Sequence, residues 1–131
     1  MDLSNLDLKL IVARQPVAVG ILTNDKFMFY ESGILTEDFL KCSSGKEQVN
    51  HGVSVVGFGR TKYDDDLSEY CEEYWIVKNT WGPRWGEKGF FRLCMDGTGS
   101  KKVPYGTCQI NRYPTYPTMD PEDTIIPSLI M

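Results

Sequence analysis

The sequence predicts an α+β fold that is mostly β, with one short helix near the N-terminus. The helix is expected within residues 4–15, because Ser4 or Asn5 can cap its first turn and the Gln15-Pro16 pair ends it. Runs of β-branched and aromatic residues, bounded by glycine and polar turns, predict the strands. These strands are expected at residues 17–22, 49–59, 73–79 and 90–94.

Each strand has its own local signal. The first follows Pro16 and ends where Asn24-Asp25 predicts a turn. The second is β-branched and bounded by glycine, which is typical of a buried strand. The last two are expected to form an antiparallel hairpin around a long glycine-rich loop at residues 81–89. We expect the core of the sheet to contain Val17, Val19, Val53, Val55, Ile76, Val77 and Phe91.

Length and composition exclude several classes of protein. The 131 residues suit one domain, and 41% hydrophobic and 24% charged residues are ordinary for a globular protein. The net charge of -4 argues against nucleic-acid binding, which needs clustered lysine and arginine. No run of about 18 apolar residues is present to span a membrane. Residues 1–7 lack the pattern of a secretory signal peptide, so we expect a cytosolic protein or a piece of a longer precursor.

The four cysteines leave two interpretations open. Cys42, Cys71, Cys94 and Cys108 are scattered along the chain. Because no close C-x-x-C pair is present, a zinc knuckle or a thioredoxin-like motif is not expected. An even number of scattered cysteines fits two disulfides in an oxidising compartment, whereas the other interpretation is four buried free thiols. Pairing the arms of the predicted hairpin brings Cys71 and Cys94 to nearby positions.

His51 and Asn79 are the residues whose setting suggests chemistry. His51 is the only histidine, and a lone histidine on a strand is usually structural, but its neighbours Asn50 and Gly52 leave one ring edge accessible. Asn79 ends a predicted strand shortly before Trp81. An asparagine carbonyl can accept the imidazole N–H and orient the ring, and a tryptophan can shield that hydrogen bond from water. The spacing of the two residues suits adjacent strands joined by a loop.

The runs around His51 and Asn79 resemble the histidine and asparagine motifs of the papain-like cysteine proteases, the peptidase family of papain and the cathepsins. The resemblance covers about residues 5–117 and implies the C-terminal lobe of a two-lobe papain-like fold, the β-rich right lobe with a twisted antiparallel sheet. The segments that resemble the family, in the same order, are residues 15–19, 29–34, 49–59, 74–82, 85–92, 108–110 and 113–117.

The resemblance implies a role for each matching residue. His51 matches the catalytic histidine, which holds the thiolate as an ion pair and later protonates the leaving amine. Asn79 matches the residue that orients this histidine, and Trp81 matches the indole that covers their hydrogen bond. Tyr113 stands where a small or charged residue is usual, which implies a shallow specificity pocket. The positions that line this pocket are matched by Gly20, Asn50, Gly52 and Tyr113.

Disulfides and cellular location also follow from the resemblance. Cys42 and Cys108 match a disulfide of this half of the fold, and a Cys71–Cys94 bridge would be additional. Bonded cysteines would place the protein in a lysosome, in a vacuole or outside the cell. No metal or organic cofactor is implied: one histidine cannot build a zinc site, and the acidic run at residues 64–66 lacks the ligand spacing of a calcium loop.

The nucleophile of the family is missing from this sequence. The motif Cys-Gly-Ser-Cys-Trp and the oxyanion glutamine belong to the first half of the family's catalytic domain, and no cysteine here lies in such a context. A base without its thiol performs no acyl transfer, so the chain alone is expected to be inactive. We expect this chain to be the C-terminal part of a cysteine endopeptidase that cleaves polypeptides and acts together with an N-terminal lobe as its partner. A truncated gene of such an enzyme would give the same sequence. The alternative is a non-catalytic module with a structural or binding role in a larger assembly.

The sequence predicts one lobe followed by a C-terminal extension. The lobe is expected at residues 1–117, and an acidic and apolar extension at residues 118–131 suits either docking on another chain or a disordered end. The charged run at residues 62–69 is expected to be a solvated surface loop. A lone lobe would expose a large apolar face, so we expect that the chain is not a free monomer.

Overall fold

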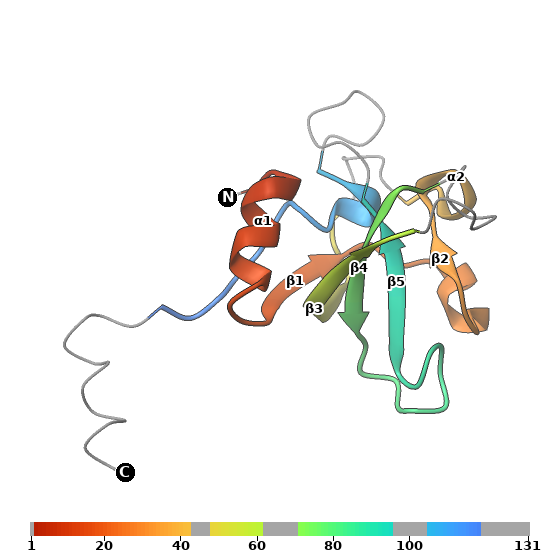
Figure 1. Cartoon of the computed structure of the whole chain (residues 1–131). Helices are drawn as coiled ribbons and strands as arrows, with labels where there is room; N and C mark the ends of the chain where they lie inside the picture. The colour runs from red at the N-terminus through yellow and green to blue at the C-terminus, as the bar shows by residue number, and fades with distance from the viewer. Residues whose placement is uncertain (1, 43–47, 62–70, 96–104, 119–131) are drawn as a thin grey trace, which may run out of the picture.

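A computed structural model describes residues 2–42, 48–61, 71–95 and 105–118 (Figure 1). Its centre is a five-stranded sheet with the strand order β1-β3-β4-β5-β2. The predicted α+β, mostly β fold is confirmed. The strands are β1 (Val17–Ile21), β2 (Ile34–Leu35), β3 (His51–Arg60), β4 (Glu73–Lys78) and β5 (Phe90–Cys94).

Most of the sheet is antiparallel, as predicted. β1 pairs with β3, β3 with β4, and β4 with β5, and the last pair is the expected hairpin. β2 differs, because Ile34 and Leu35 pair in parallel with β5, so the sheet is mixed. A strand of two residues is too short to show an alternating pattern. Its direction is decided by the path of the chain around it, which the sequence did not reveal.

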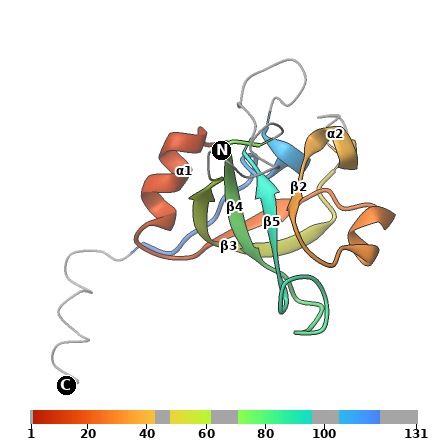
Figure 2. The same cartoon turned by 45° about the vertical axis from the view of Figure 1, so that its right-hand side comes forward.

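Short helical segments lie at the two ends of the sheet. Figures 1 and 2 show α1 at the β1 end and α2 at the β2 end. The predicted turn at Asn24 begins the segment η1, where the Asn24 side chain accepts a hydrogen bond from the Lys26 N–H at 3.1 Å. The segments are α1 (Asn5–Val12), η1 (Asp25–Phe29), α2 (Glu37–Leu40) and η3 (Thr107–Gln109).

The cap of α1 is Ser4, not Asn5. The Ser4 hydroxyl accepts a hydrogen bond from the Asp7 N–H at 3.1 Å, which satisfies one of the free donors of the first turn. Leu8 and Val12 are buried because residues four apart share one face of a helix. The helix therefore covers the β1 end of the sheet with one narrow apolar stripe.

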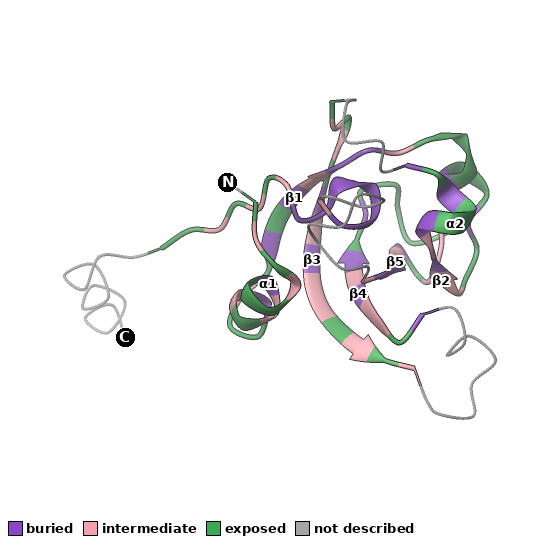
Figure 3. Ribbon diagram, turned by 90° about the horizontal axis from the view of Figure 1, so that it is seen from above, coloured by how far each residue is buried: buried purple, intermediate pink, exposed green. Residues whose placement is uncertain are grey.

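The core contains the predicted strand residues with one exception. Figure 3 shows buried positions alternating with partly buried and exposed ones along the strands. Ile76 is only partly buried, so the expectation for this residue was wrong. Successive side chains of a strand point to opposite faces, and Ile76 and Val77 therefore cannot both face the core. Trp75 takes the inward position at 0% exposure. The confirmed core residues are Val17, Val19, Val53, Val55, Val77 and Phe91.

A β-bulge divides the pairing of β3 with β4. The register shifts by one residue between Val55 and Gly57, so one residue of β3 has no partner of its own on β4. On the N-terminal side of the bulge, the register continued past the end of β4 places His51 beside Trp81. The bulge thus sets which residues of the two strands meet at this end of the sheet.

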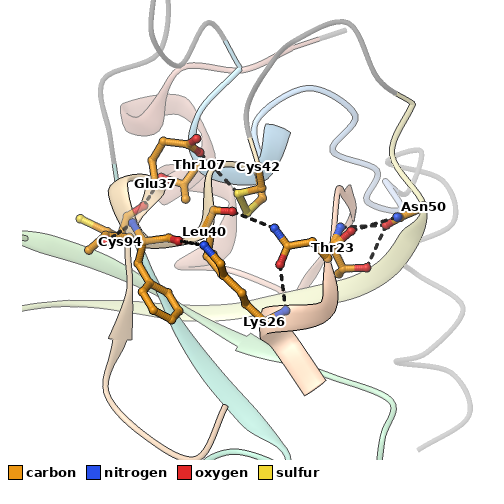
Figure 4. Close-up of a disulfide and its surroundings, with 12 residues drawn as sticks. Thr23, Lys26, Glu37, Leu40, Cys42, Asn50, Cys94 and Thr107 are labelled. Atoms are coloured by element: carbon orange, nitrogen blue, oxygen red, sulfur yellow. Dashed lines mark hydrogen bonds between the residues drawn. A yellow bond between two sulfur atoms is a disulfide. The ribbon is translucent and has the colours of Figure 1, made fainter. Parts of the chain in front are cut away.

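The four cysteines form two disulfides, Cys42–Cys108 and Cys71–Cys94. The first joins the segment after α2 to η3, and the second joins the segment just before β4 to the end of β5. Between them, the Thr107 hydroxyl donates a hydrogen bond to the Cys94 carbonyl oxygen at 2.7 Å (Figure 4). The structure therefore supports the disulfide interpretation over four free thiols.

Three expectations concern residues that the structure does not describe. The charged run at residues 62–69 and the acidic run at residues 64–66 lie outside the described residues, as do residues 119–131 of the extension. The division into a lobe at residues 1–117 and an extension at residues 118–131 therefore stays a prediction.

We predict that the two disulfides stabilise the fold to different extents. Cys42 and Cys108 are separated by 66 residues and Cys71 and Cys94 by 23. Because a bridge that closes a longer loop constrains the unfolded chain more, replacing the first pair by alanine should cost about 4 kcal/mol and the second about 3 kcal/mol. Urea unfolding at pH 7 measures both costs. Equal or reversed costs would show that local packing, not loop length, determines the effect.

Candidate active site

His51 and Asn79 meet at one end of the sheet. His51 is the first residue of β3, and Asn79 directly follows β4. The Nε2 atom of His51 lies 2.7 Å from the Oδ1 atom of Asn79, which is hydrogen-bond distance. Asn79 is buried, and the His51 ring is partly buried. The structure thus brings together the two residues that sequence reasoning paired.

A backbone donor determines which way the Asn79 amide points. The Thr80 N–H donates to Asn79 Oδ1 at 2.7 Å, and an NH₂ group in that place would set donor against donor. Because a carbonyl oxygen only accepts, the Nε2 atom of His51 must carry the hydrogen of the His51–Asn79 bond. In the neutral ring the lone pair is then on Nδ1, the nitrogen available for acid–base chemistry.

The Asn79 amide holds this orientation at a cost. Its Nδ2 group is buried and has no hydrogen-bond partner among the described residues. A buried donor without a partner costs about 1–3 kcal/mol. The amide oxygen accepts two hydrogen bonds, whereas the amide nitrogen donates none to the described residues. Such an arrangement is typical of a functional site, where a side chain orients a neighbour at some cost in stability.

Trp81 covers the His51 ring. The centroids of the two rings are 5.2 Å apart, and their planes are tilted by 34°. Trp81 itself is 41% exposed, so its indole lies between the His51 ring and solvent. Excluding water strengthens the hydrogen bond between His51 and Asn79, and the face of an indole attracts a positive charge on the ring beside it.

The loop that carries Trp81 depends on a glycine. Residues 79–89 join β4 to β5, and Figure 2 shows the connection extending beyond the ends of these strands. Gly86 has a φ of 60°, in the left-handed region that favours glycine. A Cβ atom there would lie 2.7 Å from the Phe90 carbonyl oxygen and 3.0 Å from the Tyr30 ring. Gly86 therefore lets the loop turn and lets Tyr30 approach it closely.

An ion pair ties the loop to the sheet. Arg92 on β5 donates to both carboxylate oxygens of Glu87, from Nε and from Nη2, each at 2.9 Å. Glu87 also accepts the Gly33 N–H at 3.2 Å, and the Tyr30 hydroxyl donates to the Gly33 carbonyl oxygen at 2.7 Å. These bonds join the loop, β5 and the turn before β2.

The charges of this cluster reinforce one another. Burial alone would raise the pKa of Glu87, but the hydrogen bonds from Arg92 and Gly33 outweigh it and hold the pKa below its usual value. The Glu87 carboxylate in turn raises the pKa of Arg92. Burial, together with the nearby Glu87 charge, raises the pKa of Tyr30 far above its usual value. At neutral pH the ion pair is charged and the Tyr30 hydroxyl keeps its proton.

The four residues expected to line a specificity pocket are brought together only in part. Gly20 pairs with Gly52 across β1 and β3. The β-bridge between β1 and the C-terminal segment, continued by two residues, places Tyr113 on the other side of Gly20. Asn50 instead bonds to Thr23, accepting its N–H at 2.8 Å and donating to its carbonyl oxygen at 3.1 Å (Figure 4). The pocket role of these residues stays a prediction.

The site holds an oriented imidazole but no thiol. The chain has four cysteines, and all of them lie in the described residues and are bonded in disulfides. Within the described part of the chain, no group of three or more His, Cys, Asp or Glu residues could hold a metal ion. No helix in the same residues is long and apolar enough to cross a membrane. The oriented His51 ring can accept and donate a proton at Nδ1.

Sequence reasoning assigned no role to several residues that support the site. The run that resembles the asparagine motif contains Trp85, Glu87 and Arg92. The opposite charges of Glu87 and Arg92, on either side of a glycine turn, were a signal from which their ion pair could have been predicted. The contribution of Thr80 had no such signal, because it comes from a backbone N–H that every residue except proline has.

Comparison with known proteins agrees with this geometry. Residues 4–118 match the family described as papain family cysteine protease. The chain is 40% identical over 115 residues to cysteine proteinase EP-B 1 of Hordeum vulgare and 42% identical over 113 residues to vignain of Phaseolus vulgaris. These matches cover 87% and 86% of this chain but only 26% of each relative. The chain therefore spans about a quarter of the length of the curated relatives that it matches.

Solved structures show the same fold. The bromelain protease from Ananas comosus aligns with a TM-score of 0.69 and 31% identity, over 88% of this chain and 46% of that chain. The Amb a 11 cysteine protease, a ragweed pollen allergen, aligns with a TM-score of 0.64 and 35% identity, over 86% of this chain and 29% of that chain. The chain belongs to the papain family of cysteine proteases, and the expected β-rich C-terminal lobe is confirmed.

We predict that Asn79→Ala releases the Nε2 atom of His51. Without its acceptor, nothing holds the hydrogen at Nε2, and the neutral ring should populate both tautomers. ¹⁵N NMR of the imidazole measures the tautomer, and the signal is unambiguous because the chain has one histidine.

The matched control is Asn50→Ala, which removes an asparagine adjacent to His51 whose side chain bonds to Thr23 instead. This variant should keep the single tautomer with hydrogen on Nε2. The same single tautomer in Asn79→Ala would show that another group orients the ring.

We predict that Glu87→Gln destabilises the fold in a pH-dependent way. The pKa of Glu87 is lower in the folded chain than the value of about 4.3 expected in the unfolded chain. Its contribution is therefore present above about pH 4.3 and is lost as the pH falls through the folded-state pKa. At pH 7 the substitution should lower the free energy of unfolding by about 1.5–3 kcal/mol, and the difference should shrink below pH 4.

Urea unfolding between pH 3 and pH 7 measures this difference. Glu72→Gln serves as the control, because the Glu72 side chain is 76% exposed and its contact with Arg60 is 3.6 Å long, so its loss should cost less than about 0.5 kcal/mol. A cost for Glu87→Gln that does not change with pH would contradict the charged ion pair.

Proposed function

We propose that this chain is the C-terminal part of a papain-like cysteine endopeptidase, which hydrolyses peptide bonds with a thiol from an N-terminal lobe. The observation that supports this best is the 2.7 Å hydrogen bond from His51 Nε2 to Asn79 Oδ1 beneath the Trp81 indole. A hydrogen-bonded Nε2 leaves Nδ1 as the atom that faces the thiol in the proposed enzyme. The lengths covered, 26% of the curated relatives and 46% of bromelain, fit a part rather than a whole.

In the proposed reaction His51 acts first as base and then as acid. The thiol of the other lobe transfers its proton to Nδ1, and the thiolate attacks the carbonyl carbon of the peptide bond. The Nδ1–H then protonates the leaving amine, and an acyl-enzyme remains. Nδ1 next takes a proton from water, whose oxygen attacks the acyl carbon, and the proton returns to the thiol. Asn79 keeps the ring oriented throughout, and Trp81 keeps water from their hydrogen bond.

The same proposal assigns a substrate pocket. Gly20 and Gly52 pair across β1 and β3, and the Val49 side chain fills the space beside Gly20, where a Cβ atom would lie 2.9 Å from Val49 Cγ2. The backbone is therefore open to an approaching substrate at Gly52. Among the described residues, and apart from its two neighbours in the chain, no atom lies within 4 Å of the place where a Cβ of Gly52 would be. Tyr113 borders these glycines and makes the pocket shallow, and Asn50 forms its rim. We propose that this pocket accepts a side chain of a polypeptide substrate.

Exposed apolar residues and the two disulfides support a proposal for the partner and for the compartment. Met28, Phe29 and Phe39 are 63%, 79% and 56% exposed, which fits a chain that is not a free monomer. We propose the N-terminal lobe with the nucleophilic cysteine as the partner. The two disulfides support an oxidising compartment, a lysosome, a vacuole or the outside of the cell.

One alternative function fits the same cysteines. All four cysteines are bonded, so the chain brings no nucleophile of its own. A lobe that has lost its catalytic partner would serve as a structural or binding module of a larger assembly. The two functions differ in what accompanies the chain in the cell, which an experiment can decide.

The test is purification from the native source with a tagged, irreversible, thiol-directed inhibitor and a broad peptide substrate. We expect a second polypeptide that carries the Cys-Gly-Ser-Cys-Trp motif to accompany the chain and to take the label. In the reconstituted pair, His51→Ala should lower kcat by about 10⁴-fold or more, whereas Phe58→Leu, on the same strand and outside the site, should leave it unchanged. Unrelated companions without any label would reject the protease and support the non-catalytic module.

A further inference from the structure

A row of aromatic rings leads from the turn before β2 to His51. The ring of Tyr30 lies 5.3 Å from that of Trp85, the ring of Trp85 lies 5.1 Å from that of Trp81, and the ring of Trp81 lies 5.2 Å from that of His51. Each distance is within the range of favourable ring contacts. These four residues are called the aromatic row below.

The two tryptophans of the row differ in how firmly they are held. Trp85 donates a hydrogen bond from Nε1 to the Phe27 carbonyl oxygen at 2.8 Å, and its ring packs edge-on against buried Phe91 at 5.6 Å. Trp81 is 41% exposed and, among the described residues, contacts the rings of His51 and Trp85 without a hydrogen bond. The position of the Trp81 indole therefore depends on its packing against the Trp85 ring.

Trp85 in turn depends on Tyr30. The Tyr30 side chain is 7% exposed, and its hydroxyl donates to the Gly33 carbonyl oxygen at 2.7 Å and accepts the Arg92 N–H at 3.4 Å. The bidentate pair of Glu87 and Arg92 holds the strand and the turn to which this hydroxyl is bonded. The Tyr30 ring is thus held by the hydrogen bonds of its hydroxyl while its face and edges pack against aromatic neighbours that include Trp85.

We propose that Tyr30 and Trp85 are positioning residues, which hold the Trp81 indole over His51 and so keep the His51–Asn79 hydrogen bond covered. The inference rests on the proposed function only in naming His51 as the catalytic base. Without Trp85, an exposed tryptophan side chain is free to occupy other rotamers and no longer stays over the imidazole. The ion pair of Glu87 and Arg92 acts on His51 indirectly, through Tyr30 and Trp85 and through the loop that carries Trp81.

The test uses proton NMR of the 131-residue chain. An indole held over an imidazole displaces the C–H signals of that ring, and the chain has a single histidine to observe. Trp81→Ala defines the signal without the indole. Trp85→Leu should remove at least half of the displacement seen in the wild-type chain. Tyr30→Leu should also reduce it, and Tyr30→Phe, which keeps the ring, should restore most of it.

The matched control is Phe58→Leu. Phe58 is 39% exposed and packs edge-on against Trp75 at 6.3 Å, outside the aromatic row, so its loss should leave the His51 signals unchanged. A folded Trp85→Leu chain with both disulfides formed and with wild-type His51 signals would overturn the proposal.

A second measurement covers the case in which these variants fail to fold. ¹⁵N relaxation of the wild-type chain gives order parameters for the indole N–H groups of Trp81 and Trp85. Both should be rigid, near 0.85, and a Trp81 value below about 0.6 beside a rigid Trp85 would overturn the proposal. Neither readout needs activity, so a failed inhibitor label rejects the proposed protease while the NMR result decides the aromatic row separately.

Discussion

The pairing of β3 with β4 is the constraint on which the arrangement of this lobe depends. His51 and Asn79 are 28 residues apart in the chain and 2.7 Å apart in space, because one begins β3 and the other follows β4. The bulge between Val55 and Gly57 shifts the register once within this pair. A slip of one residue turns every side chain of a strand to the other face, so the same pairing that buries the core also aims His51.

The site is held by its surroundings at some cost to stability. Asn79 has a buried amide nitrogen without a partner among the described residues, and Lys88 in the following loop has a φ of 58°, where only glycine is unstrained. The same loop is tied down by the ion pair of Glu87 and Arg92 and by its contact with Tyr30. The stabilising interactions around this loop therefore offset the cost of its strained and unpaired groups without removing them.

The two halves of the proposed chemistry make different demands on a protein. A base needs a fixed ring with one free nitrogen, and the hydrogen bonds at Asn79 Oδ1 supply this within a single lobe. A nucleophile needs an accessible thiol, and here every cysteine is used to stabilise the fold. In the proposed enzyme the reaction therefore takes place where two lobes meet, and neither lobe holds the full set of catalytic groups.

The sequence alone determined the mostly β fold, the limits of the long strands to within two residues, and the pairing of His51 with Asn79, because these depend on local patterns and on a recognisable motif. Tertiary structure decided the rest. Trp75 rather than Ile76 faces the core because the alternation of the strand is set by the register of the sheet. The Thr80 N–H orients Asn79, and Tyr30 supports Trp85 across the fold, through a backbone group and a contact between distant residues. Such contributions have no pattern in the sequence, because they exist only once distant segments are in place.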